Sequence, residues 1–415
     1  MSVAADDAGA PATGPATGPA TAGPATAGPA TAGIGPGDDG LWAVAGRWPG
    51  VAVALAVFGL TRVVQLIMLS WLDAAAPEHT SLREHLLEWD GGWFIRVATE
   101  GYPTGYSYET NGDVAGNGLA FFPLYPMLIR SFAGLGLSPG TAALTVTWLA
   151  SIAAAVALHL LGSTLYSRRV GWALVALCCA QPLSVVLSMA YSESLFLALV
   201  AGMLAAAHRR VWWAAGLLGL GAALTRPTGL AAATALAVAA LLAVRADRRG
   251  AWRPLLAAAV ALAGVPAYLG WVAVRVGDPD AWFTVQTAGW GTSFDGGAST
   301  LSFLRTTFGT GDGFVPVSVA LILLVAVAAA GMALLARPWL PLAVYGLIAM
   351  VLVYGQAGFY HSKPRLLLPV LLILLPAAVA AGRARPRVAV PALVAWGLLG
   401  LWYGAHMVVV WPYTI

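Results

Sequence analysis

Charged side chains are scarce in this 415-residue chain. Asp, Glu, Lys and Arg together make up 10% of it, and Lys363 is the only lysine. A soluble globular domain carries about 25% charged residues, so that class is excluded. Hydrophobic residues make up 59% of the chain, and its mean hydropathy is +0.79. Apolar runs of about 18 residues or more recur without the alternation of barrel strands, so we expect an all-α polytopic membrane protein.

Cysteine and soluble cofactor motifs are also scarce. Cys178 and Cys179 are adjacent in an apolar run, so they form no disulfide framework, and no metal-ligand spacing surrounds them. The chain has no GxxxxGK[ST] loop, strand-bound GxGxxG, CxxC or HExxH motif. A soluble nucleotide-sugar domain and ATP-driven transport are therefore disfavoured, and any donor must come from the membrane. Nucleic acid is not an expected partner, because the basic residues form short clusters between apolar runs.

Two parts of the chain differ in composition. Residues 1–40 repeat Pro, Ala, Thr and Gly without apolar periodicity, which predicts a disordered cytoplasmic tail. Residues 41–415 are predicted to form one transmembrane domain. No basic segment closely precedes the first apolar run, so we expect a retained anchor helix rather than a signal peptide. About eleven transmembrane helices are expected, near residues 50–72, 141–163, 171–190, 193–207, 211–224, 228–244, 254–276, 314–336, 339–355, 365–382 and 388–411.

The distribution of charge predicts the orientation. The long loops 73–140 and 277–313 fall on one side of the expected helices and, outside the N-terminal tail, hold almost every carboxylate. The positive-inside rule assigns the opposite, arginine-rich side to the cytoplasm. We expect a multi-pass protein of the plasma membrane, with its N-terminus inside and its C-terminus outside. The arginine-rich side holds Arg47, Arg168, Arg169, Arg209, Arg210, Arg245, Arg248, Arg249, Arg253, Arg337, Arg383, Arg385 and Arg387.

The first outer loop contains the segment EWDGGWFIRVATEGYP at residues 88–103. Apolar side chains recur there at helical spacing, which predicts a helix lying at the membrane surface with Trp at headgroup depth. Asp90 is therefore expected at the membrane–water boundary. Two interpretations are open: Asp90 acts on a substrate, or it only caps a helix beginning at Gly91 or Gly92. The apolar stripe consists of Leu82, Leu86, Trp89, Trp93 and Val97.

Several charged residues lie inside the apolar runs or at their ends. A charge at the centre of a membrane helix costs about 2.5–3.5 kcal/mol, so such groups are usually paired or functional. Arginine binds phosphate through two parallel bonds, and lysine binds it as a point charge, which favours an anionic lipid headgroup as ligand. The alternative is an interhelical Glu193–Arg226 pair with the other cations as flanking residues. Arg62 lies within the first run; Glu193, Arg226, His361, Lys363 and Arg365 lie on the side expected for Asp90.

The segment GLAFFPLYPMLIR, residues 118–130, adds aromatic residues and two prolines to the first outer loop. Prolines restrict the backbone, so this composition predicts a re-entrant or interfacial turn before the second apolar run. Packing of the loop alone is the alternative interpretation.

Five segments together resemble the PIG-V family, the second mannosyltransferase of GPI-anchor assembly and its bacterial relatives. They are WDGGWFIRVATEGY, AFFPLYPML, AYSESLF, TRPTG and FYHSKPRLLLP, in the order of that family. The resemblance covers about residues 50–410 and implies a GT-C type glycosyltransferase whose active site faces away from the cytoplasm. The N-terminal repeat is not a feature of that family. Because a chain rich in Ala, Gly and Arg with one lysine suggests a GC-rich bacterium, the family's acceptor is not carried over.

The resemblance places the family's acidic residue at Asp90. We therefore expect inverting transfer of mannose from a polyprenyl-phosphate donor to a lipid, glycan or protein acceptor, with Asp90 as the base. Cations would hold the leaving phosphate, so no metal or other cofactor is expected. The expected phosphate-binding residues are Arg226, His361, Lys363, Arg365 and Arg62. The expected substrate-binding residues are Trp89, Trp93, Phe121, Phe122 and Tyr125 as apolar walls, and Glu193 as a partner of Arg226 or of sugar hydroxyls.

Two other function classes remain open. A lipid-linked sugar flippase or another transporter would use the same charges as a substrate path. Many transporters contain internal repeats, and none is found among these apolar runs. A scaffold of an envelope complex would tolerate replacement of Asp90 by Asn.

Overall fold

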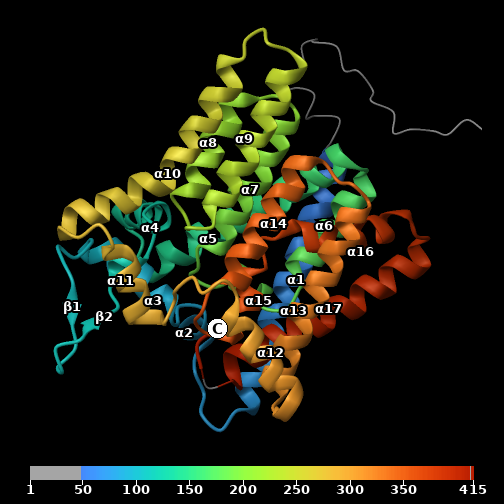
Figure 1. The fold of residues 1–415 in the computed structure, drawn as a ribbon. Coiled ribbons are helices and arrows are strands. Elements are labelled where there is room, and N and C mark those ends of the chain that lie inside the picture. Colours follow the sequence, from blue (N-terminus) through green and yellow to red (C-terminus); the bar gives the residue numbers. More distant parts are fainter. Residues whose placement is uncertain (1–47, 412) are drawn as a thin grey trace, which may run out of the picture. The chain divides into compact units, whose positions relative to one another are not determined.

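A computed structural model describes residues 48–411 and 413–415, so the predicted N-terminal tail and Arg47 lie outside the described residues. Helices make up most of this part (Figure 1). Its elements are α1 (Trp48–Ala75), α2 (Leu82–His85), α3 (Asp90–Glu100), β1 (Ser107–Tyr108), β2 (Val114–Ala115), η2 (Gly118–Ala120), α4 (Leu124–Gly134), α5 (Pro139–Leu165), α6 (Arg168–Cys179), η3 (Ser184–Leu187), α7 (Glu193–His208), α8 (Trp212–Ala223), α9 (Gly229–Ala246), α10 (Trp252–Val276), α11 (Ala281–Trp290), α12 (Ala298–Thr310), α13 (Phe314–Leu335), α14 (Leu340–Gly355), η4 (Tyr360–Ser362), α15 (Lys363–Leu366), α16 (Leu371–Arg383) and α17 (Pro386–Val409).

The described residues contain six helices that are long and apolar enough to cross a membrane: α1, α5, α9, α10, α13 and α17. A bent pair, η4–α15 followed by α16, makes a seventh if it forms one span. The shorter apolar helices α7, α8 and α14 coincide with three further expected spans. These lengths and compositions support a multi-pass membrane protein, whereas the count of eleven spans stays a prediction.

The expected span at 171–190 is not one helix. α6 ends at Cys179, and the chain turns into the short helix η3. The buried guanidinium of Arg62 in α1 donates to the backbone oxygens of Cys179 and Ser184 and to the Ser188 hydroxyl. The last carbonyls of a helix lack partners within it. A charged donor from another helix therefore allows the segment to break inside the protein.

The expected span at 365–382 is broken as well, because the chain bends by 58° between α15 and α16. Two side chains satisfy carbonyls freed at the bend. Gln181 Nε2 donates to the oxygen of Leu368 at 3.0 Å, and the Tyr345 hydroxyl donates to that of Pro369 at 2.9 Å. The bend separates α15, which carries Arg365, from the rest of the apolar run.

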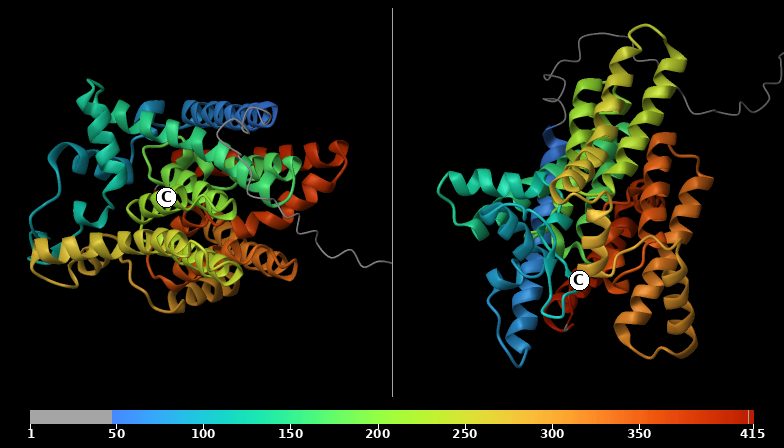
Figure 2. Two further views of the ribbon diagram at one scale, coloured as in Figure 1. Left: turned by 90° about the horizontal axis from the view of Figure 1, so that it is seen from above. Right: turned by 60° about the vertical axis from the view of Figure 1, so that its left-hand side comes forward.

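The packing of α8 against α10 depends on small residues. A Cβ on Gly216 would lie 3.0 Å from the Ala257 Cα, and one on Gly219 would lie 2.8 Å from the Ala261 Cβ. Helices associate closely in membranes where such small side chains meet. α8 also packs against α7, which packs against α5, while α1 packs against α6 and α17 (Figure 2).

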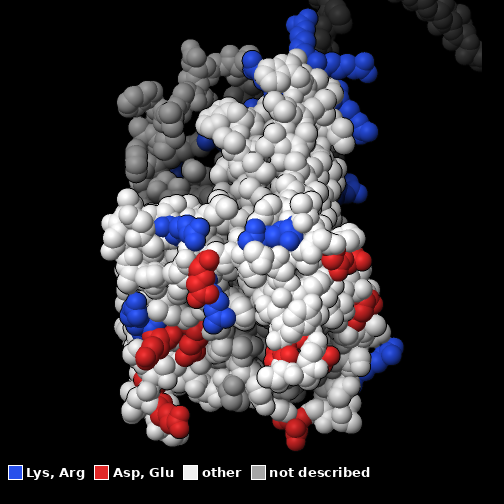
Figure 3. Space-filling model, turned by 90° about the vertical axis from the view of Figure 1, so that its left-hand side faces the viewer, with Lys and Arg blue, Asp and Glu red and all other residues white. Residues whose placement is uncertain are grey.

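Charges are distributed unevenly along the helices. Figure 3 shows Lys and Arg without Asp or Glu at the end where α9 turns into α10, whereas the other half of this face carries its Asp and Glu together with further Lys and Arg. The absence of acids at the first end of this face agrees with the pattern on which the predicted orientation depends.

Candidate active site

A cavity of about 180 Å³ lies between the start of α3, the α8–α9 connection, α11 and the segment leading into α15. Three charged residues from distant parts of the sequence line it: Asp90, Arg226 and Arg365. Its walls include the aromatic residues Phe94, Phe121, Phe122, Trp282, Trp290 and Phe359. The structure thus brings together the predicted acidic residue and two of the predicted phosphate-binding cations.

The charged residues form one chain of ion pairs. Arg365 Nη1 donates to Asp90 Oδ2 at 2.7 Å, and Arg365 Nε lies 3.4 Å from Glu193 Oε1. Arg226 Nη1 lies 2.8 Å from the same Glu193 oxygen and donates to the Ser192 hydroxyl at 3.1 Å. Two carboxylates therefore balance two guanidiniums. Glu193 is only 1% exposed, so it contacts both arginines from beneath the cavity.

Local structure aims Asp90 at this cluster. The capping alternative requires a helix that begins at Gly91 or Gly92, but α3 begins at Asp90 itself. The Asp90 carboxylate accepts a hydrogen bond from Arg365. An acid in the first helical turn also interacts favourably with the helix dipole. The preceding Trp89 has φ +55°, which separates α2 from α3. The expected single surface helix is therefore two helices. Gly91 fits closely against Ala190, since an added Cβ would lie 3.2 Å from the Ala190 Cβ.

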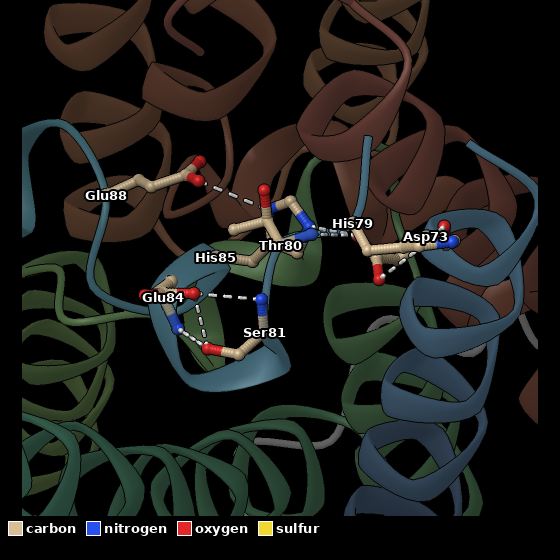
Figure 4. Close-up of polar contacts among 7 residues, drawn as sticks. All are labelled: Asp73, His79, Thr80, Ser81, Glu84, His85 and Glu88. Atoms are coloured by element: carbon tan, nitrogen blue, oxygen red, sulfur yellow. Dashed lines mark hydrogen bonds and ion pairs between the residues drawn. The ribbon is translucent and has the colours of Figure 1, made fainter. Parts of the chain in front are cut away.

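The residues before α3 are held by a buried histidine (Figure 4). His85 is 6% exposed; its Nε2 lies 3.0 Å from Asp73 Oδ1 in α1, and its Nδ1 lies 3.2 Å from Glu88 Oε1. Burial raises the pKa of the Glu88 carboxyl above its ordinary value. Ser81 and Glu84 form a reciprocal capping box at the start of α2. These contacts fix the approach to α3 relative to the end of α1.

Three predicted phosphate-binding residues lie outside the cavity lining. Arg62 holds the end of α6, as described above. Lys363 is buried, and its Nζ donates to the backbone oxygens of Val353 at 2.8 Å and Gln356 at 2.7 Å. His361 is buried beside the Phe359 and Trp411 rings. Neither ring nitrogen of His361 has a hydrogen-bond partner among the described residues.

The predicted aromatic residues divide in the same way. Phe121 and Phe122 line the cavity. Trp93 stacks on Phe121 with ring centroids 6.0 Å apart and so supports the wall from behind. Tyr125 is fully buried, and its hydroxyl hydrogen-bonds with Thr147. Trp89 packs against the apolar core.

The second outer loop supplies lining residues that the sequence analysis did not name. Trp282, Gln286 and Trp290 of α11 all line the cavity. Their spacing of four residues places them on one helix face, and that periodicity was the available signal. Close contact between the loops explains their position: a Cβ on Gly116 would lie 2.5 Å from the Gly289 Cα.

A hydrogen bond outside the cavity also joins the two outer loops. The Tyr106 hydroxyl donates to Asp278 Oδ2 at 2.5 Å. This hydrogen bond holds the pKa of the Asp278 carboxyl below its ordinary value. The contact fixes the first outer loop against the start of the second.

Known proteins resemble this chain in sequence and in fold. Residues 70–244 match the family model of the mannosyltransferase PIG-V. GPI mannosyltransferase 2 of Drosophila pseudoobscura pseudoobscura is 30% identical over 137 residues, which cover 30% of this chain and only 27% of that protein. The crystal structure of ArnT from Cupriavidus metallidurans bound to undecaprenyl phosphate superposes with a TM-score of 0.52 at 18% identity, covering 86% of this chain and 64% of ArnT. The expected GT-C type fold is confirmed.

Proposed function

We propose that this protein is a membrane mannosyltransferase that works in the cavity beside Asp90, because residues 70–244 match the family model of the mannosyltransferase PIG-V. The proposed donor is a polyprenyl-phosphate mannose. Undecaprenyl phosphate bound to ArnT, which has a similar fold, supports a lipid phosphate as the group recognised. The acceptor is a hydroxyl of a lipid, glycan or protein, and the reaction takes place on the extracytoplasmic face.

The observation that carries this proposal is the meeting of one carboxylate and two guanidiniums in an aromatic-walled cavity. Arg226 and Arg365 suit a phosphate, because guanidinium groups donate in a fork that matches its oxygens. Asp90 suits the acceptor hydroxyl. The aromatic walls offer apolar surface to the sugar ring and to the first isoprene units.

The proposed reaction is an inverting displacement. The acceptor oxygen attacks the anomeric carbon opposite the phosphate, and its proton passes to the Asp90 carboxylate. The bond between the anomeric carbon and the phosphate oxygen breaks, and its electron pair leaves with the phosphate. Arg226 and Arg365 stabilise the charge that develops there.

The ion pairs suggest an order for these events. Asp90 and Arg365 are in contact in the substrate-free protein. An entering donor phosphate competes with Asp90 for this arginine, since the four charged groups already balance. Binding of the donor would therefore release the Asp90 carboxylate to accept a proton.

The test compares membranes that contain wild type, Asp90→Asn or Asp113→Asn at matched levels. Asp113 is a matched control because it is an exposed acid of the same outer loop and lies outside the cavity lining. With radiolabelled polyprenyl-phosphate mannose and host acceptors, Asp90→Asn should transfer label on the order of 100-fold more slowly or worse. Equal transfer by all three proteins would leave Asp90 as a structural partner of Arg365. Label that crosses the bilayer without transfer would support a flippase.

We further propose that the transfer needs no metal ion. Arg226 and Arg365 can both donate to the leaving phosphate, and the described residues contain no group of three or more Asp, Glu, His or Cys suited to a metal. Transfer by purified protein should stay within about twofold of its untreated rate in excess EDTA, because the guanidinium charges supply the stabilisation. A loss of activity that Mg²⁺ or Mn²⁺ restores would contradict this proposal.

A further inference from the structure

A second, larger hollow lies at the other end of α8 and α10, with a volume of about 640 Å³. We call it the α8–α10 groove. Its lining includes three tryptophans, Trp212, Trp213 and Trp252, and two arginines, Arg210 and Arg253. Leu217, Leu256 and Val260 continue it along the helices. The proposed active site lies at the opposite ends of these helices, so the mechanism above does not use this groove.

The close packing of α8 and α10 explains where the groove begins. Gly216 meets Ala257 at backbone distance, so the helices touch there. Both residues line the groove. On the side of this contact away from the active site, bulky Trp and Arg side chains replace the small ones. The two helix surfaces therefore leave a hollow that opens between large side chains.

Charge distinguishes this groove from an ordinary lipid-facing hollow. Arg210 and Arg253 are exposed, and among the described residues neither has a carboxylate within ion-pair distance. Asp247, in the adjacent α9–α10 turn, accepts a hydrogen bond from the backbone N–H of Arg249. Arg253 instead lies over the Trp252 ring, with its guanidinium carbon 5.5 Å from the ring centroid.

We propose that the α8–α10 groove binds one anionic glycerophospholipid. Its phosphate lies between Arg210 and Arg253, and one acyl chain runs along the apolar wall toward Val260. Charge complementarity favours this occupant. An anionic lipid brings a net negative charge to the two unpaired guanidiniums, whereas a zwitterionic lipid carries no net charge. Basic pockets between membrane helices on the cytoplasmic side bind acidic headgroups in this way. Tryptophan rings at headgroup depth complete the site.

The test is native mass spectrometry of the full chain. Delipidated protein is incubated with equal amounts of phosphatidylglycerol and phosphatidylcholine in mixed micelles. Wild type should retain one phosphatidylglycerol in preference to phosphatidylcholine. The Arg210→Gln/Arg253→Gln variant should lose that preference about 30-fold, since each of the two basic residues near a membrane surface contributes on the order of 1 kcal/mol. The matched control, Arg248→Gln/Arg249→Gln, removes the same charge from the same end but leaves the groove lining intact.

Three results would overturn the proposal. An equal loss in the control would show that the charge of this whole end attracts the lipid rather than a built site. Equal retention of both lipids by wild type would exclude headgroup selection, whatever the variants do. Undecaprenyl phosphate that displaces phosphatidylglycerol at equal concentration would identify a lipid-carrier site instead.

Discussion

Glu193 shows how a single residue organises the cavity. It is 1% exposed at the start of α7, and its Oε1 faces both Arg226 and Arg365. Burying a carboxylate is costly unless cations compensate it, so Glu193 and the arginines depend on one another. The structure contains the Glu193–Arg226 pair that the sequence left as one alternative. The same pair presents Arg226 to the cavity, so the structural and functional interpretations are compatible.

This dependence predicts strong coupling in a double-mutant cycle. Arg226→Gln should destabilise the protein by about 2–4 kcal/mol, because it removes the nearer cation from a buried carboxylate. Glu193→Gln should cost less. The double variant should be more stable than the sum of the single losses implies, by about 1–3 kcal/mol. Unfolding in detergent measures all four proteins. Losses that add within 0.5 kcal/mol, as for independent sites, would refute the coupling.

The structure brings some of the predicted site residues together at the cavity and places others elsewhere. Asp90, Arg226 and Arg365 meet at the cavity, as the grouping of charges on one side indicated. The same grouping selected Lys363, and a charge within an apolar run selected Arg62, but both hydrogen-bond to backbone carbonyls. A charge in an apolar run must find a partner, but its position in the sequence does not distinguish a substrate from a broken helix end.

At the scale of elements, Lys363 stabilises the end of α14. Its ammonium group donates to the oxygens of Val353, in the last turn of the helix, and of Gln356, just beyond it. A cation there satisfies carbonyls without helical partners and interacts favourably with the helix dipole. The contact also joins α14 to α15, the element that carries Arg365.

Lys363→Met should therefore lower the stability of the protein more than it weakens donor binding. Losing two charge-assisted hydrogen bonds should cost about 2–4 kcal/mol. Hydrogen exchange should rise at residues 350–358, whereas the KM for the lipid-linked donor should change less than about threefold. Lys363→Arg, which keeps the charge, serves as the control and should restore part of the protection. A large rise in donor KM with unchanged exchange would instead place Lys363 on the substrate.

Element positions could be read from hydropathy, but helix breaks could not. Helices lie at nearly every expected apolar run, because each run is long enough to require internal backbone pairing in lipid. The runs at 171–190 and 365–382 break because Arg62, Gln181 and Tyr345 supply distant donors to the freed carbonyls. Contacts between residues that are far apart in the sequence cannot be predicted from the local sequence pattern. The contact of α11 with the first outer loop was not predicted for the same reason.

At the scale of the whole chain, two hollows of different character lie at opposite ends of α8 and α10. The cavity with Asp90 lies beside the long, acidic loops, and the α8–α10 groove lies beside the arginine-rich turns. Both proposals depend on which end faces the cytoplasm. Orientation is therefore the property of the whole molecule that most needs an independent measurement.

Introduced cysteines can measure that orientation, because Cys178 and Cys179 are 0% and 2% exposed and give a silent background. Asp113, near the β1–β2 turn, and Arg249, in the α9–α10 turn, are both exposed positions. In intact cells a membrane-impermeant maleimide should label Asp113→Cys and spare Arg249→Cys, which should react only after permeabilisation. This pattern follows from the positive-inside rule. The reverse pattern would place Asp90 in the cytoplasm, so both the extracytoplasmic reaction and the cytoplasmic lipid site would have to be abandoned together.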